Sequence, residues 1–136
     1  MDLKILEIAS NTENNKVIDN FTHRSKNKNP ICGDEMEISL IVENDTVIDM
    51  GYQCKSCVYC QASVSLLSQK IKNKKLNEIR DFINTCENIF ENTKIVLEKN
   101  WKDFIKLLNK KNASRKEWLL LPLRNVLKAL KISWLI

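Results

Sequence analysis

Apolar and polar residues alternate in the second quarter of the chain. Between residues 36 and 42 the apolar positions recur with a period of two, which predicts a half-buried strand. The residues at 44–45 predict a tight turn, and residues 47–53 predict the partner strand of a hairpin. A weaker strand is expected within residues 17–26, around Phe21. These segments predict a small antiparallel sheet of about three strands.

Helical spacing replaces this alternation after the hairpin. The apolar positions that fall on one helix face are Cys57, Cys60, Val64, Leu67 and Ile71. Residues 2–10, 76–90 and 118–134 predict further helices, and residues 95–108 predict a third long helix or a helical excursion. Pro122 is expected in the first turn of the last helix, where proline is tolerated. We therefore expect an α+β fold in which helices cover the sheet, as a single domain over residues 1–136.

The composition of the chain limits the classes of function that we expect. An apolar fraction of 43% and a charged fraction of 29% are those of a globular domain, and no apolar run approaches the length of a membrane span. The N-terminus has no secretory signal, so a cytoplasmic location is expected. The net charge of +5 does not predict nucleic-acid binding, because lysines and acidic residues are interleaved, as in residues 94–102. We expect neither a nucleic-acid nor a membrane partner.

The number and positions of the cysteines indicate which chemistry to expect of the chain. The chain has five, and without an export signal they favour metal or thiol chemistry over disulfides. Four of them lie between residues 32 and 60, whereas Cys86 stands apart and is interpreted as a small apolar residue of a helix.

One arrangement of these cysteines predicts a metal site. The segment Cys32-Gly33-Asp34 leads into the first strand of the hairpin, and Cys57 follows the return strand at the start of a helix. A helix N-terminus favours thiolate over thiol, and a hairpin brings its two ends to one end of the sheet. Two sulfur donors and one oxygen donor are then expected to converge, a set that suits zinc or the iron of a cluster.

The other cysteines leave alternatives open. The run from Cys54 through Cys57 to Cys60 lacks the further cysteine and proline of a ferredoxin and the second pair of a zinc ribbon. A redox pair, Cys54–Cys57 or Cys57–Cys60, is an alternative. Cys60 shares the apolar stripe of its helix, which favours a core-facing thiol over a spare ligand. Cys54 ends a strand and can face either the site or the sheet.

At these motifs the chain resembles a known family. Asn29-Pro30-Ile31-Cys32-Gly33-Asp34 resembles the N-P-x-C-G-D signature of the IscU/SufU/NifU-type iron–sulfur cluster assembly scaffolds. The segment from Cys57 to Gln61-Ala62-Ser63-Val64-Ser65 is similar to the second cysteine loop and A-S-x-S helix of that family. The resemblance extends from about residue 3 to residue 130. It implies an IscU/SufE-like α+β sandwich with Cys32, Asp34 and Cys57 as ligands.

The chain departs from the family pattern before the last helix. Trp118 stands where the family has its third cysteine, and Glu117 stands where one branch often has histidine. The Leu-Pro-Pro-Val-Lys chaperone-recognition stretch of the IscU branch is absent, because residues 112–116 read Asn-Ala-Ser-Arg-Lys. Cys54, Cys60 or Glu117 could serve as a fourth ligand, as could an exogenous thiol or water. Trp118 is expected to pack as core or to cover the site.

The resemblance implies a carrier rather than an enzyme. It would bind a transient 2Fe–2S cluster, or Zn²⁺, and a cysteine desulfurase and apo iron–sulfur proteins would be its partners. One alternative is a zinc-bound sulfur acceptor that activates the desulfurase, as in the SufU branch. Another is a degenerate interaction module that keeps only the fold. The sequence leaves a homodimer open.

Overall fold

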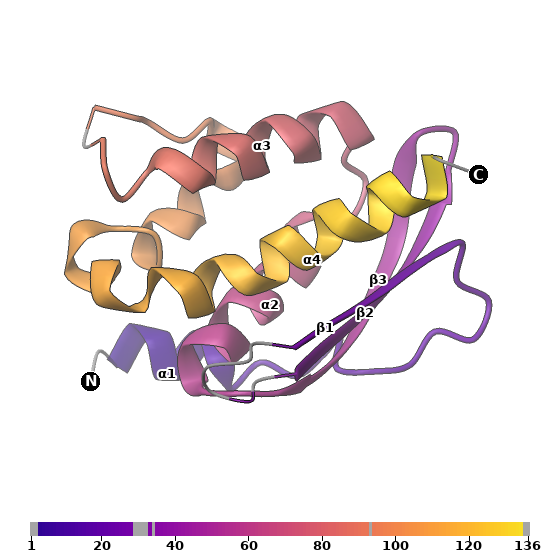
Figure 1. Cartoon of the computed structure of the whole chain (residues 1–136), viewed down its shortest axis with the longest axis horizontal. Helices are drawn as coiled ribbons and strands as arrows, with labels where there is room; N and C mark the ends of the chain where they lie inside the picture. The colour runs from indigo at the N-terminus through magenta and orange to yellow at the C-terminus, as the bar shows by residue number, and fades with distance from the viewer. Residues whose placement is uncertain (1–2, 29–32, 34, 93, 135–136) are drawn as a thin grey trace.

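The computed structural model describes residues 3–28, 33, 35–92 and 94–134, and the side chains up to residue 131 (Figure 1). Its elements are α1 (Leu3–Ala9), β1 (His23–Lys28), β2 (Glu35–Glu43), β3 (Thr46–Lys55), α2 (Val58–Lys70), α3 (Leu76–Asn88), the 3-10 helices η1 (Lys99–Lys106) and η2 (Lys110–Arg115), and α4 (Lys116–Trp134). The predicted α+β class is confirmed: a three-stranded antiparallel sheet packs against helices.

The hairpin of β2 and β3 is confirmed with its turn. Glu43 lies opposite Thr46, so Asn44 and Asp45 form a two-residue connection. Both turn residues have positive φ, 51° and 59°, as a type I′ hairpin turn requires. Asn and Asp tolerate this left-handed conformation better than other non-glycine residues, which explains why they connect the strands.

The first strand lies later than predicted. β1 begins at His23, after Phe21, and of its described side chains only Ser25 is buried. This edge strand therefore lacks the apolar alternation that identifies a strand in a sequence. The apolar signal before it comes from Ile18, which is buried against Gly51 of β3. A side chain at Gly51 would lie 2.6 Å from the Lys16 carbonyl oxygen, so the glycine permits this segment to cross β3 closely.

Helices α2 and α4 pack against the sheet, α1 packs against α2, and α3 packs against α4 on the side away from the strands (Figure 1). Residues 62–68 of α2 are all buried, so this helix is enclosed on more sides than its single apolar stripe predicts. Serine hydroxyls supply the polar contacts of the enclosed faces. Ser63 Oγ donates to the Leu119 carbonyl at 2.6 Å, and Ser65 Oγ donates to the Asn11 carbonyl at 2.7 Å.

The last helix begins before the predicted start. α4 starts at Lys116, so Pro122 lies in its second turn, and the prediction of a first-turn proline was wrong. Proline there removes one backbone donor from the helix ladder, and packing of α4 against the sheet and α2 offsets that loss.

Residues 95–108 were predicted as either a third long helix or a helical excursion, and the structure shows the helical excursion. Within it, the structure forms the 3-10 helix η1 and buries Trp101 and Phe104. Within the part of the chain that the structure describes, no helix has both the length and the apolar character that a membrane crossing demands.

Candidate metal centre

The register of the hairpin brings the flanks of both predicted ligand loops together. Glu35 lies opposite Lys55, and Met36 lies opposite Cys54. The chain enters β2 directly after the Cys32-Gly33-Asp34 segment and leaves β3 toward Cys57, at the same end of the sheet. Cys32 and Asp34 lie outside the described residues, so their place beside Cys57 stays a prediction.

Gly33 has the backbone conformation that its loop requires. Its φ is 73°, in the left-handed region, where a Cβ atom is disfavoured. A Cβ built at Gly33 would meet no described heavy atom within 4 Å. The requirement for glycine therefore comes from the backbone and not from crowding.

Cys57 is the N-cap residue of α2 and is half-buried. Its carbonyl accepts the Gln61 backbone N–H at 3.1 Å, and the Gln61 side-chain amide donates to the Ser56 carbonyl at 2.9 Å. These bonds hold the loop against the first turn of the helix. As the N-cap residue, Cys57 lies at the positive end of the helix dipole, which stabilises negative charge in general.

Cys54 and Cys60 lie beside one another, in different surroundings. Cys54 is half-buried and its sulfur is 2.9 Å from Ser56 Oγ. Cys60 has no exposed surface, which confirms the core-facing interpretation. A hydrogen bond with Cys54, followed by burial, raises the pKa of the Cys60 thiol, so it stays protonated at neutral pH. Cys86 is also fully buried, as expected of a small apolar helix residue.

Glu117 lies in an ion-pair network that joins α3 to α4. Its Oε2 accepts a 2.6 Å hydrogen bond from Nη1 of Arg124. The other two bonds of Arg124 run from Nε and Nη2 to the two carboxylate oxygens of Glu87, both at 2.8 Å. The hydrogen bond from Arg124 lowers the pKa of Glu87. A metal ligated by Glu117 would have to compete with Arg124 for this carboxylate.

Trp118 is partly buried and packs against the core, which is one of the two roles predicted for it. The guanidinium of Arg115 lies over its ring, 5.5 Å from the ring centre, and 5.3 Å from the ring centre of Tyr59. These contacts place the start of α4 beside the start of α2, and hence near Cys57. Sequence reasoning missed Arg115 and Tyr59, because no spacing pattern links residues so far apart in the chain.

Within the described ranges, no three His, Cys, Asp or Glu side chains are grouped so as to hold a metal ion. Cys32 and Asp34 lie outside these ranges, so the predicted set of three ligands stays a prediction.

The family described as "NifU-like N terminal domain" matches residues 2–103, three quarters of the chain. The chain belongs to this family. The resemblance to the IscU/SufU/NifU-type iron–sulfur cluster assembly scaffolds is thereby confirmed. The match to the NifU-like family includes the Cys32-Gly33-Asp34 segment and Cys57, and it ends before α4, so Glu117 and Trp118 lie beyond it.

One curated relative supports the membership. The chain is 34% identical, over 83 residues, to the iron–sulfur cluster assembly scaffold protein IscU of Thermotoga maritima. The aligned part is 61% of this chain and 58% of that protein, so the chain spans less than two thirds of this relative.

Two solved structures confirm the fold. A putative scaffold protein for the SUF system from Fervidobacterium islandicum superposes with a TM-score of 0.87 at 22% identity, covering 96% of each chain. The N-terminal NifU-like protein of Brucella abortus superposes with a TM-score of 0.83 at 19% identity, covering 96% of this chain and 91% of that chain. At 96% coverage both similarities reach into α4, so the shared fold continues beyond residue 103, where the family match ends.

Proposed function

We propose that this chain is an iron–sulfur cluster assembly scaffold that holds iron and sulfide as cargo on Cys32, Asp34 and Cys57 and passes the cluster to apo-proteins. Membership of the NifU-like family supports the general role. The observation that carries the proposal for the site is the hairpin register. Because Glu35 pairs with Lys55, the flanks of both ligand loops lie at one end of the sheet.

The donor set suits a cargo that must be released. Cysteine thiolates bind iron strongly through soft sulfur, and the Asp34 carboxylate would be a harder and weaker ligand of iron. Exchange of this oxygen donor would open a coordination position for a ligand from the receiving protein. The helix N-terminus at Cys57 favours the thiolate that ligation needs.

Among the three candidate fourth ligands, we favour Cys54. It ends β3, next to the loop that carries Cys57, and it is half-buried. Cys60 has no exposed surface and holds its proton, and Glu117 is bonded to Arg124. Ligation by Cys54 would require its sulfur to exchange its contacts with Ser56 and Cys60 for the metal.

The proposed partners follow from the chemistry. Sulfide for a cluster would come from a cysteine desulfurase as persulfide sulfur, and apo iron–sulfur proteins would receive a transient 2Fe–2S cluster. We propose that this exchange takes place in the cytoplasm, on a single domain, without catalysis by the chain itself.

A second candidate is a zinc-bound sulfur acceptor for the desulfurase. The half-buried position of Cys57 at the start of α2 favours it, because a thiolate there can meet a partner's persulfide. In that step the Cys57 thiolate would attack the outer persulfide sulfur, the sulfur–sulfur bond would break, and the partner's cysteine would leave as thiolate. One zinc per chain after purification, with stimulation of a desulfurase, would favour this candidate over the scaffold.

Anaerobic reconstitution with iron and sulfide tests the scaffold proposal. The wild-type chain should develop cluster absorption in the visible region and lose it when an apo-ferredoxin is added. Cys32→Ala and Cys57→Ala should fail to develop it, whereas Cys86→Ala, a buried cysteine on α3, should resemble the wild type. The proposal is excluded if wild type shows no cluster, or if both ligand variants load as well as the wild type.

A further inference from the structure

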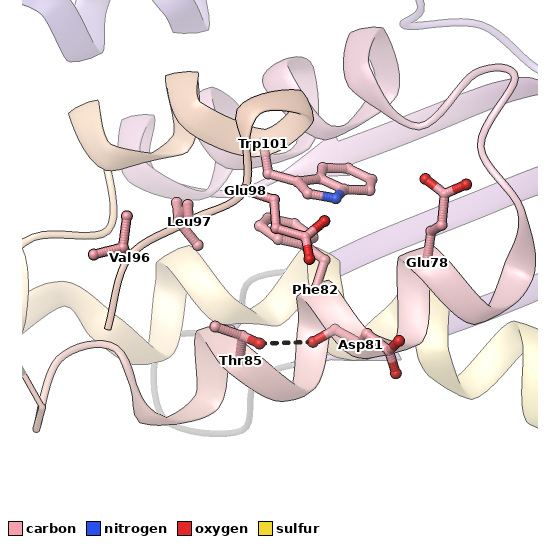
Figure 2. Close-up of a pocket in the computed structure, with 8 residues that line it drawn as sticks. All are labelled: Glu78, Asp81, Phe82, Thr85, Val96, Leu97, Glu98 and Trp101. Atoms are coloured by element: carbon pink, nitrogen blue, oxygen red, sulfur yellow. Dashed lines mark hydrogen bonds between the residues drawn. The ribbon is translucent and has the colours of Figure 1, made fainter. Parts of the chain in front are cut away.

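A cavity of about 250 Å³ lies between α3 and the segment that enters η1 (Figure 2). Its floor is apolar: the rings of Phe82 and Trp101 stack with centres 4.1 Å apart and planes 6° apart. Both side chains are almost fully buried, so the floor is fixed by the core and does not depend on an occupant.

The rim of this cavity carries negative charge. Glu78 and Asp81 come from α3, and Glu98 comes from the segment before η1 (Figure 2). No lysine or arginine is among the residues that line it, although the whole chain has a net charge of +5. The Thr85 hydroxyl at the rim is already used, since it donates to the Asp81 carbonyl at 2.8 Å. Among the described lining residues, the carboxylates are therefore the charged groups that an occupant would meet.

The rim also offers apolar surface. Val96 is 85% exposed and is one of the residues that line the cavity. A Lys74 ammonium lies 5.9 Å from the centre of the Trp101 ring, and because Phe82 covers one face of that ring, Lys74 lies over the other. A ligand with a cationic group and an apolar part would therefore place the cationic group at the rim carboxylates. Its apolar part would contact Val96 and the edges of the Phe82 and Trp101 rings.

We propose that this acidic cavity (Glu78, Asp81, Phe82, Val96, Glu98 and Trp101) binds a basic segment of a partner protein, in which a lysine or arginine adjoins an apolar residue. The volume favours a side chain over a small-molecule ligand, since such pockets usually measure about 300–1,000 Å³. Charge complementarity favours a basic protein segment and disfavours nucleic acid, whose phosphates the rim would repel.

The acidic cavity is separate from the candidate metal centre. α3 packs against α4 on the side away from the sheet, whereas β2 and β3, which adjoin the predicted ligand loops in the chain, lie on the other side of α4 (Figure 1). A partner at the acidic cavity would therefore bind on the α3 side of α4. The inference goes beyond the scaffold function and does not depend on cluster binding.

Peptide titration of the metal-free full-length chain tests the proposal. The probe is a capped hexapeptide of alternating leucine and arginine, and the matched probe has glutamate in place of arginine. The basic peptide should bind and should shift the backbone NMR signals of α3 and residues 96–101, and added salt should weaken the binding.

Changing Glu78→Gln and Glu98→Gln together should weaken binding by roughly tenfold. Val96→Ser should weaken it by roughly threefold, because contact with apolar surface is lost.

The control has the same change of charge elsewhere. Glu13→Gln with Glu43→Gln alters two exposed carboxylates outside the cavity and should leave the affinity unchanged. Equal loss in both double variants, no binding at millimolar peptide, or equal binding of the glutamate peptide would overturn the proposal. A dimer in sedimentation experiments that Val96→Ser abolishes would also overturn it, because the occupant would be a second copy. Cys57→Ala should bind the peptide normally, so failure of the scaffold function and failure of this inference are distinguishable.

Discussion

The Ser63 hydroxyl donates a 2.6 Å hydrogen bond to the backbone carbonyl of Leu119 and so joins α2 to α4. Both residues are fully buried, and Pro122 follows in the same stretch of α4. Ser63→Ala should lower the free energy of unfolding by about 1 kcal/mol, because a hydrogen bond between two buried residues is lost. Urea unfolding at neutral pH measures the change. Ser114→Ala, at an exposed serine, is the control; equal midpoints for both variants would show that the bond contributes nothing.

The cysteines should differ in reactivity in the folded, metal-free chain. Cys57 is half-buried at a helix N-terminus, whereas Cys60 and Cys86 are fully buried. The hydrogen bond with Cys54, followed by burial, raises the pKa of the Cys60 thiol, and burial raises the pKa of the Cys86 thiol, so little thiolate forms at either. Timed alkylation followed by peptide mass spectrometry should modify Cys57 before Cys60 and Cys86. Modification of Cys60 as fast as in urea would contradict its buried position.

The network around Arg124 should stabilise the fold in a pH-dependent way. Arg124→Leu should cost about 1 kcal/mol at pH 7, near the upper limit for exposed pairs, because the contact with Glu87 is bidentate. The folded pKa of Glu87 is lowered from its ordinary 4.5, so the stabilisation is fully present above that pH and is lost as the pH falls through the lowered value. Thermal unfolding from pH 7 to pH 3 should show the wild type and variant converging. Arg124→Lys keeps the positive charge but not the bidentate geometry of the guanidinium, so it should lose less stability than Arg124→Leu. A stability difference between wild type and Arg124→Leu that stays constant at every pH would contradict the account.

The left-handed conformation of Gly33 leads to a prediction about its loop. Gly33→Ala should lower the free energy of unfolding by about 1–2 kcal/mol, since a Cβ is disfavoured at positive φ. Gly33→Asn should lose less, because Asn tolerates this region better. Thermal unfolding of the two variants gives the comparison. An alanine variant as stable as the wild type would show that the loop does not need this conformation.

The sequence predicted those elements that have a strong local signal. The hairpin was found because alternation over residues 36–42 and the pair Asn44-Asp45 both point to it, and the structure has the predicted turn. The burial of Cys60 was predicted from its place on an apolar stripe. β1 was misplaced because it is a polar edge strand, held by tertiary contacts such as the bond from Ser25 Oγ to Asn125 Oδ1 at 2.5 Å.

The features that were missed depend on contacts between distant parts of the chain. Pro122 was taken as a start signal, but α4 begins earlier and tolerates the proline because the helix packs against the sheet and α2. The position of Glu117 between α3 and α4, and the contact of Arg115 with Tyr59, likewise arise from packing. The ligands Cys32, Asp34 and Cys57 remain predictions from motif spacing, which the hairpin register supports at the flanks.

Cobalt substitution tests the central claim, that the two loops share one ion, most directly. Added Co²⁺ should bind the metal-free wild type with a thiolate-to-metal charge-transfer band. Cys32 and Cys57 would both be ligands of the cobalt ion. Cys32→Ala or Cys57→Ala should therefore reduce the intensity of this band by about the contribution of one thiolate, and Cys86→Ala should leave the intensity unchanged. An undiminished band in Cys32→Ala or in Cys57→Ala would contradict the claim.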